Sequence, residues 1–281
     1  MSGTLLQHGA QGDAVKAVQG LLNRNGALID EDSQYGPGTE RAVREFQAQA
    51  ALPVTGDADA ATLAALRALP EPCPPIATTA VTFIAVQEVG SRPEYDQHCA
   101  KPTFPGGESC ITIGVGYDLR FETDTFQSDW GKLLTAAQMG ALTQWLGMQG
   151  TSTDVASLAS VVIPWHAAWL VFTQSSLPKY VAQTRGAFSN FDELPLLCRG
   201  VLVSLVYNRG TSMDPNDDRR TEMRQIRDAM ASRDYAGIPA QLRAMKRLWP
   251  DARGLRDRRD QEASLFEEGL AGLAARPPAA P

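Results

Sequence analysis

The stretch "GGESCITIGVGYDLRF", Gly106 to Phe121, decides the fold of the second half of the chain. From residue 111 onward its odd positions are apolar, which is the period of a β-strand. In one straight strand, Thr112 and Asp118 would lie about 20 Å apart. If Gly114-Val115-Gly116 is a hairpin loop instead, Thr112 faces Asp118 with Cβ atoms about 5 Å apart, because glycine accepts the positive φ of a tight turn. The spacing therefore predicts a hairpin that joins a hydroxyl and a carboxylate, although a plain hairpin with a solvated polar face has the same spacing.

The helix predicted before this hairpin, in "TTAVTFIAVQEVG", carries a glutamate on its apolar stripe. Val81, Ile84, Ala85 and Glu88 follow the spacing of one helical face, and Gly90 marks the helix end. Burial and the negative end of the helix dipole both favour a protonated acid at this position. A proton donor that works near neutral pH needs such surroundings. An exposed glutamate at a frayed helix end fits the pattern equally well.

Composition excludes several classes of function. The chain has 281 residues, a net charge of −6 and no run of eighteen apolar residues, which argues against a nucleic-acid binder and against a membrane span. Its start lacks the basic and apolar segments of a secretory signal peptide. Three scattered histidines and four cysteines without a C-x-x-C pair predict no metal and no cofactor. Cys99 and Cys110 bracket a loop and either form a disulfide or stay reduced, and His166 is expected to be a buried packing residue.

A proline-rich segment, "LPEPCPPIA", separates two predicted domains. Proline lacks a backbone donor and restricts its predecessor, so neither helix nor sheet should continue through this segment. We expect a domain over 1–69, a linker over 70–77, a domain over 78–272 and a flexible tail over 273–281. The first domain shows three helical patterns, with glycines at 9, 12, 26, 36, 38 and 56 to supply its turns. The second shows one hairpin and several helices, of which the strongly apolar one from Leu194 to Tyr207 should be buried and central. The predicted fold class is mainly α, of the α+β type.

The first domain resembles the three-helix type of peptidoglycan-binding domain across nearly all of residues 4–69. One departure is that Ser33-Gln34 replaces the usual Asp-Gly before the aromatic-glycine pair, which leaves the fold little affected. The shared positions are Leu6, Gly9, Gly12, Val15, Val18-Gln19, Leu22, Gly26, Tyr35-Gly36, Thr39, Ala42-Val43, Phe46-Gln47, Thr55-Gly56 and Thr62.

The second domain resembles the phage-type lysozymes of glycoside hydrolase family 24, over about residues 79–268. The resemblance rests on Glu88 at a helix end followed by "TIGVGYD", "LVSLVYNRG" and "RRDQEASLF". Within that family it is most similar to pesticin and related endolysins, which carry the Thr-Ile-Gly-x-Gly-Tyr-Asp form. The resemblance implies a lysozyme-like fold and an inverting N-acetylmuramidase without a cofactor.

Carried over residue by residue, the resemblance makes Glu88 the general acid, Thr112 the residue that holds the attacking water and Asp118 the second carboxylate. Common phage lysozymes place the second acid six residues before the threonine, where this chain has Gly106. Asp96 and Glu108 are nearby acids that could take that role instead. Three further residues are expected to line the sugar groove, each with a packing or helix-end role as the alternative: Tyr117, Asn208 and Arg209.

The combined expectation is an endolysin-like peptidoglycan hydrolase that acts as a monomer on bacterial peptidoglycan, without nucleic acid and without stable membrane insertion. The alternatives are a lytic transglycosylase, a chitinase or other glycan hydrolase, a muramidase effector delivered by a secretion system, and a non-catalytic wall-binding protein. Such a protein would be made in the cytoplasm and would reach the cell wall or periplasm after holin release or secretion-system delivery.

Overall fold

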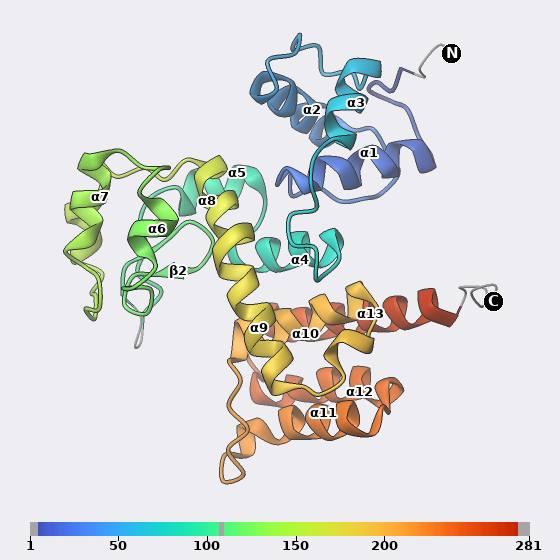
Figure 1. Cartoon of the computed structure of the whole chain (residues 1–281), viewed down its shortest axis with the longest axis vertical. Coiled ribbons are helices and arrows are strands. Elements are labelled where there is room, and N and C mark those ends of the chain that lie inside the picture. The colour runs from blue at the N-terminus through green and yellow to red at the C-terminus, as the bar shows by residue number, and fades with distance from the viewer. Residues whose placement is uncertain (1–4, 107–109, 275–281) are drawn as a thin grey trace. The chain divides into compact units, whose positions relative to one another are not determined.

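A computed structural model describes residues 5–106 and 110–274, which form two compact units (Figure 1). The first unit combines residues up to 72 with residues 85–176, and the second combines residues 73–84 with residues from 177 onward. No helix or strand crosses residues 70–77, as the prolines predict. The division into domains over 1–69 and 78–272 remains a prediction. The last helix continues to Ala274, two residues into the predicted tail, and the rest of that tail lies outside the described residues.

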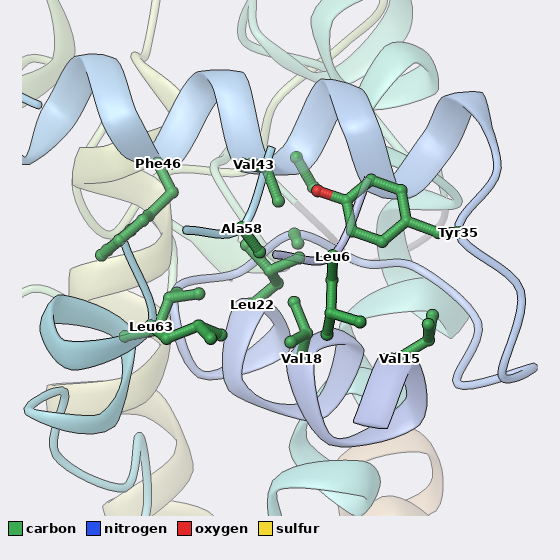
Figure 2. Packing of buried hydrophobic residues seen from close by; sticks show 12 residues of the cluster. Leu6, Val15, Val18, Leu22, Tyr35, Val43, Phe46, Ala58 and Leu63 are labelled. Carbon is green, nitrogen blue, oxygen red and sulfur yellow. The ribbon is translucent and has the colours of Figure 1, made fainter. Parts of the chain in front are cut away.

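The N-terminal part of the first unit contains the three predicted helices. They are α1 (Asp13–Arg24), α2 (Pro37–Gln49) and α3 (Ala60–Arg67). Their apolar faces meet in one core, which Figure 2 shows from close by. The labelled residues of that core are Leu6, Val15, Val18, Leu22, Tyr35, Val43, Phe46, Ala58 and Leu63.

A buried amide organises the turn between α2 and α3. Gln47 is 0% exposed, yet its side chain is hydrogen-bonded on both ends. Its Nε2 donates to the Asp57 carbonyl at 2.9 Å and to the Thr62 hydroxyl at 3.1 Å. Its Oε1 accepts the backbone N–H groups of Thr55 and Gly56 at 3.0 and 2.9 Å. Because a buried amide without partners is costly, this network fixes the turn that the glycine pattern predicts.

The remainder of the first unit holds the only strands among the described residues. The helix α4 (Thr78–Val89) belongs to both units, its last five residues to the first. The other elements are α5 (Arg92–Glu94), η1 (Tyr95–Cys99), β1 (Thr112–Ile113), β2 (Tyr117–Asp118), α6 (Phe126–Trp130), α7 (Ala136–Thr143), η2 (Asp154–Leu158), α8 (Trp165–Val171) and η3 (Phe172–Ser176).

Two tryptophans of α8 bond to the end of α1 within the first unit. The Trp165 indole N–H donates to the Gly26 carbonyl at 2.9 Å, and that of Trp169 donates to the Arg24 carbonyl at 3.3 Å. The Arg24 carbonyl is one of those that a helix C-terminus leaves without a partner, and the Gly26 carbonyl follows just after the cap residue Asn25. A Cβ on Gly26 would lie 2.6 Å from the Trp169 ring, so this contact requires glycine. The prediction of a buried His166 is wrong: it is exposed, whereas its neighbours Trp165, Ala167, Ala168 and Trp169 are buried.

Within its described residues, the second unit contains helices joined by loops, and no strand. The predicted central helix is confirmed as α10 (Leu196–Arg209), with buried residues from Cys198 to Val206. A Cβ on Gly200 would lie 2.1 Å from the Ala80 Cβ, so glycine allows α10 to approach α4 closely. The other elements are α9 (Leu177–Ala187), η4 (Phe191–Glu193), η5 (Asp218–Arg220), α11 (Thr221–Ser232), η6 (Tyr235–Gly237), α12 (Ile238–Ala244), η7 (Met245–Leu248) and α13 (Arg253–Ala274).

A buried ionic network joins α10 to α13. Glu262 and Arg259 are 0% exposed, and Arg258 is 4% exposed. One oxygen of Glu262 accepts the Ser204 hydroxyl at 2.6 Å and the Arg259 guanidinium at 2.7 Å. Burial lowers the pKa of Arg259 below its usual value. The Arg-Arg-x-x-Glu segment of the sequence is therefore packed inside the unit. The predicted fold class is confirmed: the described chain is mainly α-helical with one two-stranded sheet.

Candidate functional site

The predicted hairpin is confirmed residue by residue. Strands β1 and β2 pair antiparallel, with Thr112 opposite Asp118 and Ile113 opposite Tyr117. The corner glycines have φ values of 59° at Gly114 and 70° at position 116, which is the left-handed region. A Cβ on Gly114 would also lie 3.0 Å from the Trp130 ring. The turn therefore needs glycine for its backbone and for its packing.

The backbone of Thr112 is held from both sides. Besides its pairing with Asp118, Thr112 forms a bridge with Thr103, in which each backbone N–H donates to the other residue's carbonyl at 2.8 and 2.9 Å. The side chain of Thr112 is half-buried. These bonds fix the backbone that carries the Thr112 hydroxyl, so the hydroxyl is limited to the positions that the χ1 rotamers of this residue give.

The Asp118 carboxylate binds the backbone of its own hairpin. Its two oxygens accept the Cys110 N–H, each at 3.2 Å, and Oδ1 also accepts the Arg120 N–H at 2.9 Å. These bonds fix the carboxylate and close the segment before β1 onto the segment after β2. Spacing alone did not indicate this structural role of Asp118.

Glu88 is the last residue but one of α4, as predicted. Its stripe partners Val81, Ile84 and Ala85 are 0% exposed, and Glu88 itself is half-buried. It lies in the first unit, together with Thr112 and Asp118. Glu88 thus lies near the C-terminal end of α4, next to the buried face of that helix, which is the position that the sequence predicted for it.

The residues beside Glu88 form part of a groove. Val86, Gly90, Ser91 and Glu94 line a groove of about 470 Å³ together with residues of the three-helix domain. Those residues include Gln19, Asp30, Asp32, Gln34 and Thr39. The lining contains three carboxylates and no lysine or arginine, so it favours a ligand with hydroxyl and amide groups over an anionic one.

Asp96 and Glu108 are the two acids that could replace Asp118 as the second carboxylate. Asp96 is exposed in η1, and its carboxylate accepts the Arg92 guanidinium at 3.1 and 3.2 Å. Glu108 lies outside the described residues. Neither finding assigns the second carboxylate, and the role of Asp118 remains a prediction.

Tyr117 is a packing residue of the first unit. It is 3% exposed, its ring meets the Trp130 ring edge-on at 5.4 Å, and its hydroxyl donates to the Asp129 carboxylate at 2.9 Å. Burial raises the pKa of Tyr117 above its usual value. The Asp129 carboxylate also accepts the Ser175 hydroxyl at 2.5 Å. The sequence did not single out Asp129, because no motif surrounds it.

Asn208 and Arg209 end α10 in the second unit. They line a pocket of about 290 Å³ together with Arg219, Arg220 and Trp249. The prediction placed them in a sugar groove, and the structure places them in a pocket rich in arginine.

All four cysteines are free thiols. Cys99 and Cys110, for which the sequence allowed either a disulfide or reduced thiols, therefore form no disulfide. The Cys110 thiol instead donates to the Trp145 carbonyl at 3.4 Å. Within residues 5–106 and 110–274, no group of three or more His, Cys, Asp or Glu side chains could hold a metal ion. Over the same residues, no helix has both the length and the apolar character that crossing a bilayer would need.

Comparison with known proteins identifies the N-terminal domain. Residues 11–66 match the family model described as a putative peptidoglycan binding domain. No curated protein matches the chain. A solved structure, the Burkholderia AP3 phage endolysin, is 18% identical, with 95% of this chain and 100% of that chain covered at a TM-score of 0.23. A similarity at that TM-score supports no conclusion about fold or activity. The chain thus contains a segment of the peptidoglycan-binding type, which agrees with the resemblance in its sequence.

Proposed function

We propose that this protein is a modular peptidoglycan hydrolase, an endolysin-like muramidase of the family 24 type. It would cleave the β-1,4 bonds between N-acetylmuramic acid and N-acetylglucosamine. One observation carries the proposal: a peptidoglycan-binding segment shares a compact unit with Glu88 and with the hairpin that pairs Thr112 and Asp118.

The proposed chemistry is general acid and base hydrolysis. Glu88 donates a proton to the glycosidic oxygen as its bond to the anomeric carbon breaks. A water oriented by Thr112 attacks that carbon from the opposite face, and this attack inverts the configuration. Asp118 accepts the proton that the water loses. Glycoside hydrolysis needs two carboxyl groups and no metal ion.

The bonds of Asp118 support a second candidate function. Its carboxylate already accepts the N–H groups of Cys110 and Arg120, and therefore has fewer free lone pairs for a water. A lytic transglycosylase needs one acid and no attacking water. Its product ends in an anhydro sugar, whereas hydrolysis leaves a reducing end, so mass spectrometry of the released fragments separates the two.

The groove that Val86, Gly90, Ser91 and Glu94 line supports the modular arrangement. Its lining comes both from the three-helix domain and from residues 86–94, so one glycan strand would contact both. Binding by the domain would raise the effective concentration of wall polymer at Glu88. We propose that the protein acts as a monomer on the cell wall or in the periplasm, which it would reach after holin release or secretion-system delivery.

The test is a zymogram on purified peptidoglycan with identification of the released fragments. Glu88→Gln should fold normally and lose at least about 10²-fold in rate, since a proton donor contributes about that factor. Glu268→Gln removes the same charge from an exposed position of α13 and should keep full activity. Equal activity of the wild type and Glu88→Gln would refute the assigned acid, and an inactive wild type would refute the hydrolase.

A further inference from the structure

The pocket at the end of α10 is strongly basic for an acidic protein. Its lining includes three arginines, Arg209, Arg219 and Arg220, and a single acid, Asp217, whereas the whole chain has a net charge of −6. The pocket is local to the second unit, and its volume of about 290 Å³ would hold a small polar group. A basic pocket in an acidic protein indicates a specific anionic ligand rather than general electrostatic attraction.

Arg209 is the central cation of this pocket. Its guanidinium lies over the Trp249 ring at 5.1 Å and donates to the Arg219 carbonyl. Its Nε is buried and has no hydrogen-bond partner among the described residues. Burial, and then the charges of Arg220, Arg259 and Arg219, lower the pKa of Arg209 to about 10. A buried cation surrounded by other cations is destabilised until an anion reaches it.

Of the nearby carboxylates, one pairs with an arginine of the pocket, and two others bind Arg247, outside the lining. Arg247 binds Asp218 at 2.6 Å and Glu222 at 2.5 Å. The Asp217 carboxylate accepts the backbone N–H of Arg219 at 2.8 Å, and its other oxygen lies 3.6 Å from the Arg220 Nε. Three arginines thus share the pocket lining with one acid, which leaves the lining with a net positive charge.

Asn208 adds an acceptor beside these donors. Its Oδ1 is buried and has no hydrogen-bond partner in the part of the chain that the structure describes. The pocket thus offers guanidinium donors for an oxyanion and an amide oxygen for an N–H group. A peptide carries both groups close together, an amide N–H and a carboxylate, whereas inorganic phosphate carries only the oxyanion.

We infer that this pocket binds a peptide carboxylate, with the stem peptides of peptidoglycan as the ligand class. Arg219 binds the carboxylate, for which the fork of a guanidinium is well shaped, and Asn208 accepts the adjacent amide N–H. Arg220, which donates to the Arg209 carbonyl and pairs with Asp217, adds positive charge beside them. This inference rests on the proposed function for the choice of polymer. The pocket would make the protein distinguish peptide-bearing glycan from bare glycan.

A site-resolved labelling experiment tests this inference. The full chain is treated with phenylglyoxal, and mass spectrometry follows the modification rate of the exposed Arg219. The probe is a disaccharide tetrapeptide, compared with the same probe with amidated carboxylates, the bare disaccharide and inorganic phosphate. At a probe concentration of four times Kd, modification of Arg219 should slow about fivefold. Arg227, on α11 and outside the pocket lining, should react at an unchanged rate.

Several outcomes would overturn the inference. Unchanged labelling of Arg219, or equal protection by the amidated probe, would exclude a carboxylate ligand. Equal protection by the bare disaccharide, whose lactyl group has a carboxylate of its own, would exclude recognition of the peptide. Protection by phosphate without protection by the peptide probe would exclude the peptide.

Substitutions give an independent measure of the same contact. Arg219→Gln should weaken binding of the probe about tenfold, since a charge-assisted bond contributes about that factor, and Arg219→Lys should restore part of it. Arg227→Gln is the matched control and should bind normally. None of these measurements requires cleavage, so they can succeed or fail independently of the zymogram.

Discussion

The hairpin of the first unit and the α10–α13 contact of the second unit each depend on a carboxylate, in opposite ways. Asp118 is half-buried and accepts backbone N–H groups, so it shapes a loop at the edge of its unit. Glu262 is fully buried and accepts the side chains of Ser204, Arg258 and Arg259. Acids from two family-like motifs thus have different physical roles.

This difference separates acids that can take part in catalysis from acids that only stabilise the fold. A half-buried acid bound to backbone amides remains accessible to solvent and substrate. A fully buried acid shared by two guanidiniums is inaccessible, and its removal leaves two cations without compensation. The comparison therefore assigns Glu262 to folding and leaves Glu88 and Asp118 as candidates for catalysis.

The strongest test of this contrast is Glu262→Ala. Removing this acid should lower the free energy of unfolding by about 3–5 kcal/mol, because Arg258 and Arg259 stay buried without a counter-charge. Denaturant unfolding measures the loss. Glu268→Ala, an exposed position on the same helix, should stay within about 0.5 kcal/mol of the wild type. Similar stabilities for the two variants would refute the structural role of Glu262.

Gly114→Ala tests the corner of the hairpin. The new Cβ would lie 3.0 Å from Trp130 and 3.3 Å from Ala168, at a φ of 59° that alanine disfavours. We expect a loss of about 1–3 kcal/mol, measured by thermal unfolding. Gly140→Ala is the matched change in α7, where no atom lies within 4 Å, and should stabilise the protein by about 0.5–1 kcal/mol. A neutral Gly114→Ala would show that the turn does not need glycine.

Asp118→Asn separates the two roles of the hairpin acid. The amide keeps an oxygen for one backbone N–H but loses the charge, so stability should fall by about 1–2 kcal/mol. If Asp118 also activates water, hydrolysis should fall by about 10² or more at a temperature where the variant is folded. Asp251→Asn, at an exposed position of the second unit, is the control for both measurements. Full activity of Asp118→Asn would remove it as the second carboxylate.

The smallest expected effect concerns the buried thiols of the second unit. Burial raises the pKa of Cys73 to about 11 and that of Cys198 to about 12. Both thiols should resist alkylation at pH 8, because the thiolate is the reactive form. The stability that these neutral buried thiols contribute is complete below about pH 9. It is lost as the pH rises through the raised pKa values, because the unfolded chain then loses protons that the folded chain keeps. Mass spectrometry after brief alkylation checks this, and rapid labelling of either cysteine in folded protein would contradict it.

Local patterns were enough to predict much of the fold and part of the candidate site. The three helices, the central helix and the pairing of Thr112 with Asp118 all follow from periodicity, glycines and loop length. Each depends on residues close together in the chain, where geometry leaves few alternatives. The position of Glu88 at a helix end is predictable for the same reason.

Burial and long-range contact were decided only by the tertiary structure. Sequence spacing did not show that Tyr117 is inside the core, that His166 is exposed, or that Asp118 closes its own loop. The arginine pocket also required folding, because it combines the end of α10 with residues 217–220 and with residues 249 and 255. The sequence by itself therefore determined the local elements and the chemical groups that they carry. Only the packing decided which of those groups meet, because contacts between distant segments depend on how whole helices fit together.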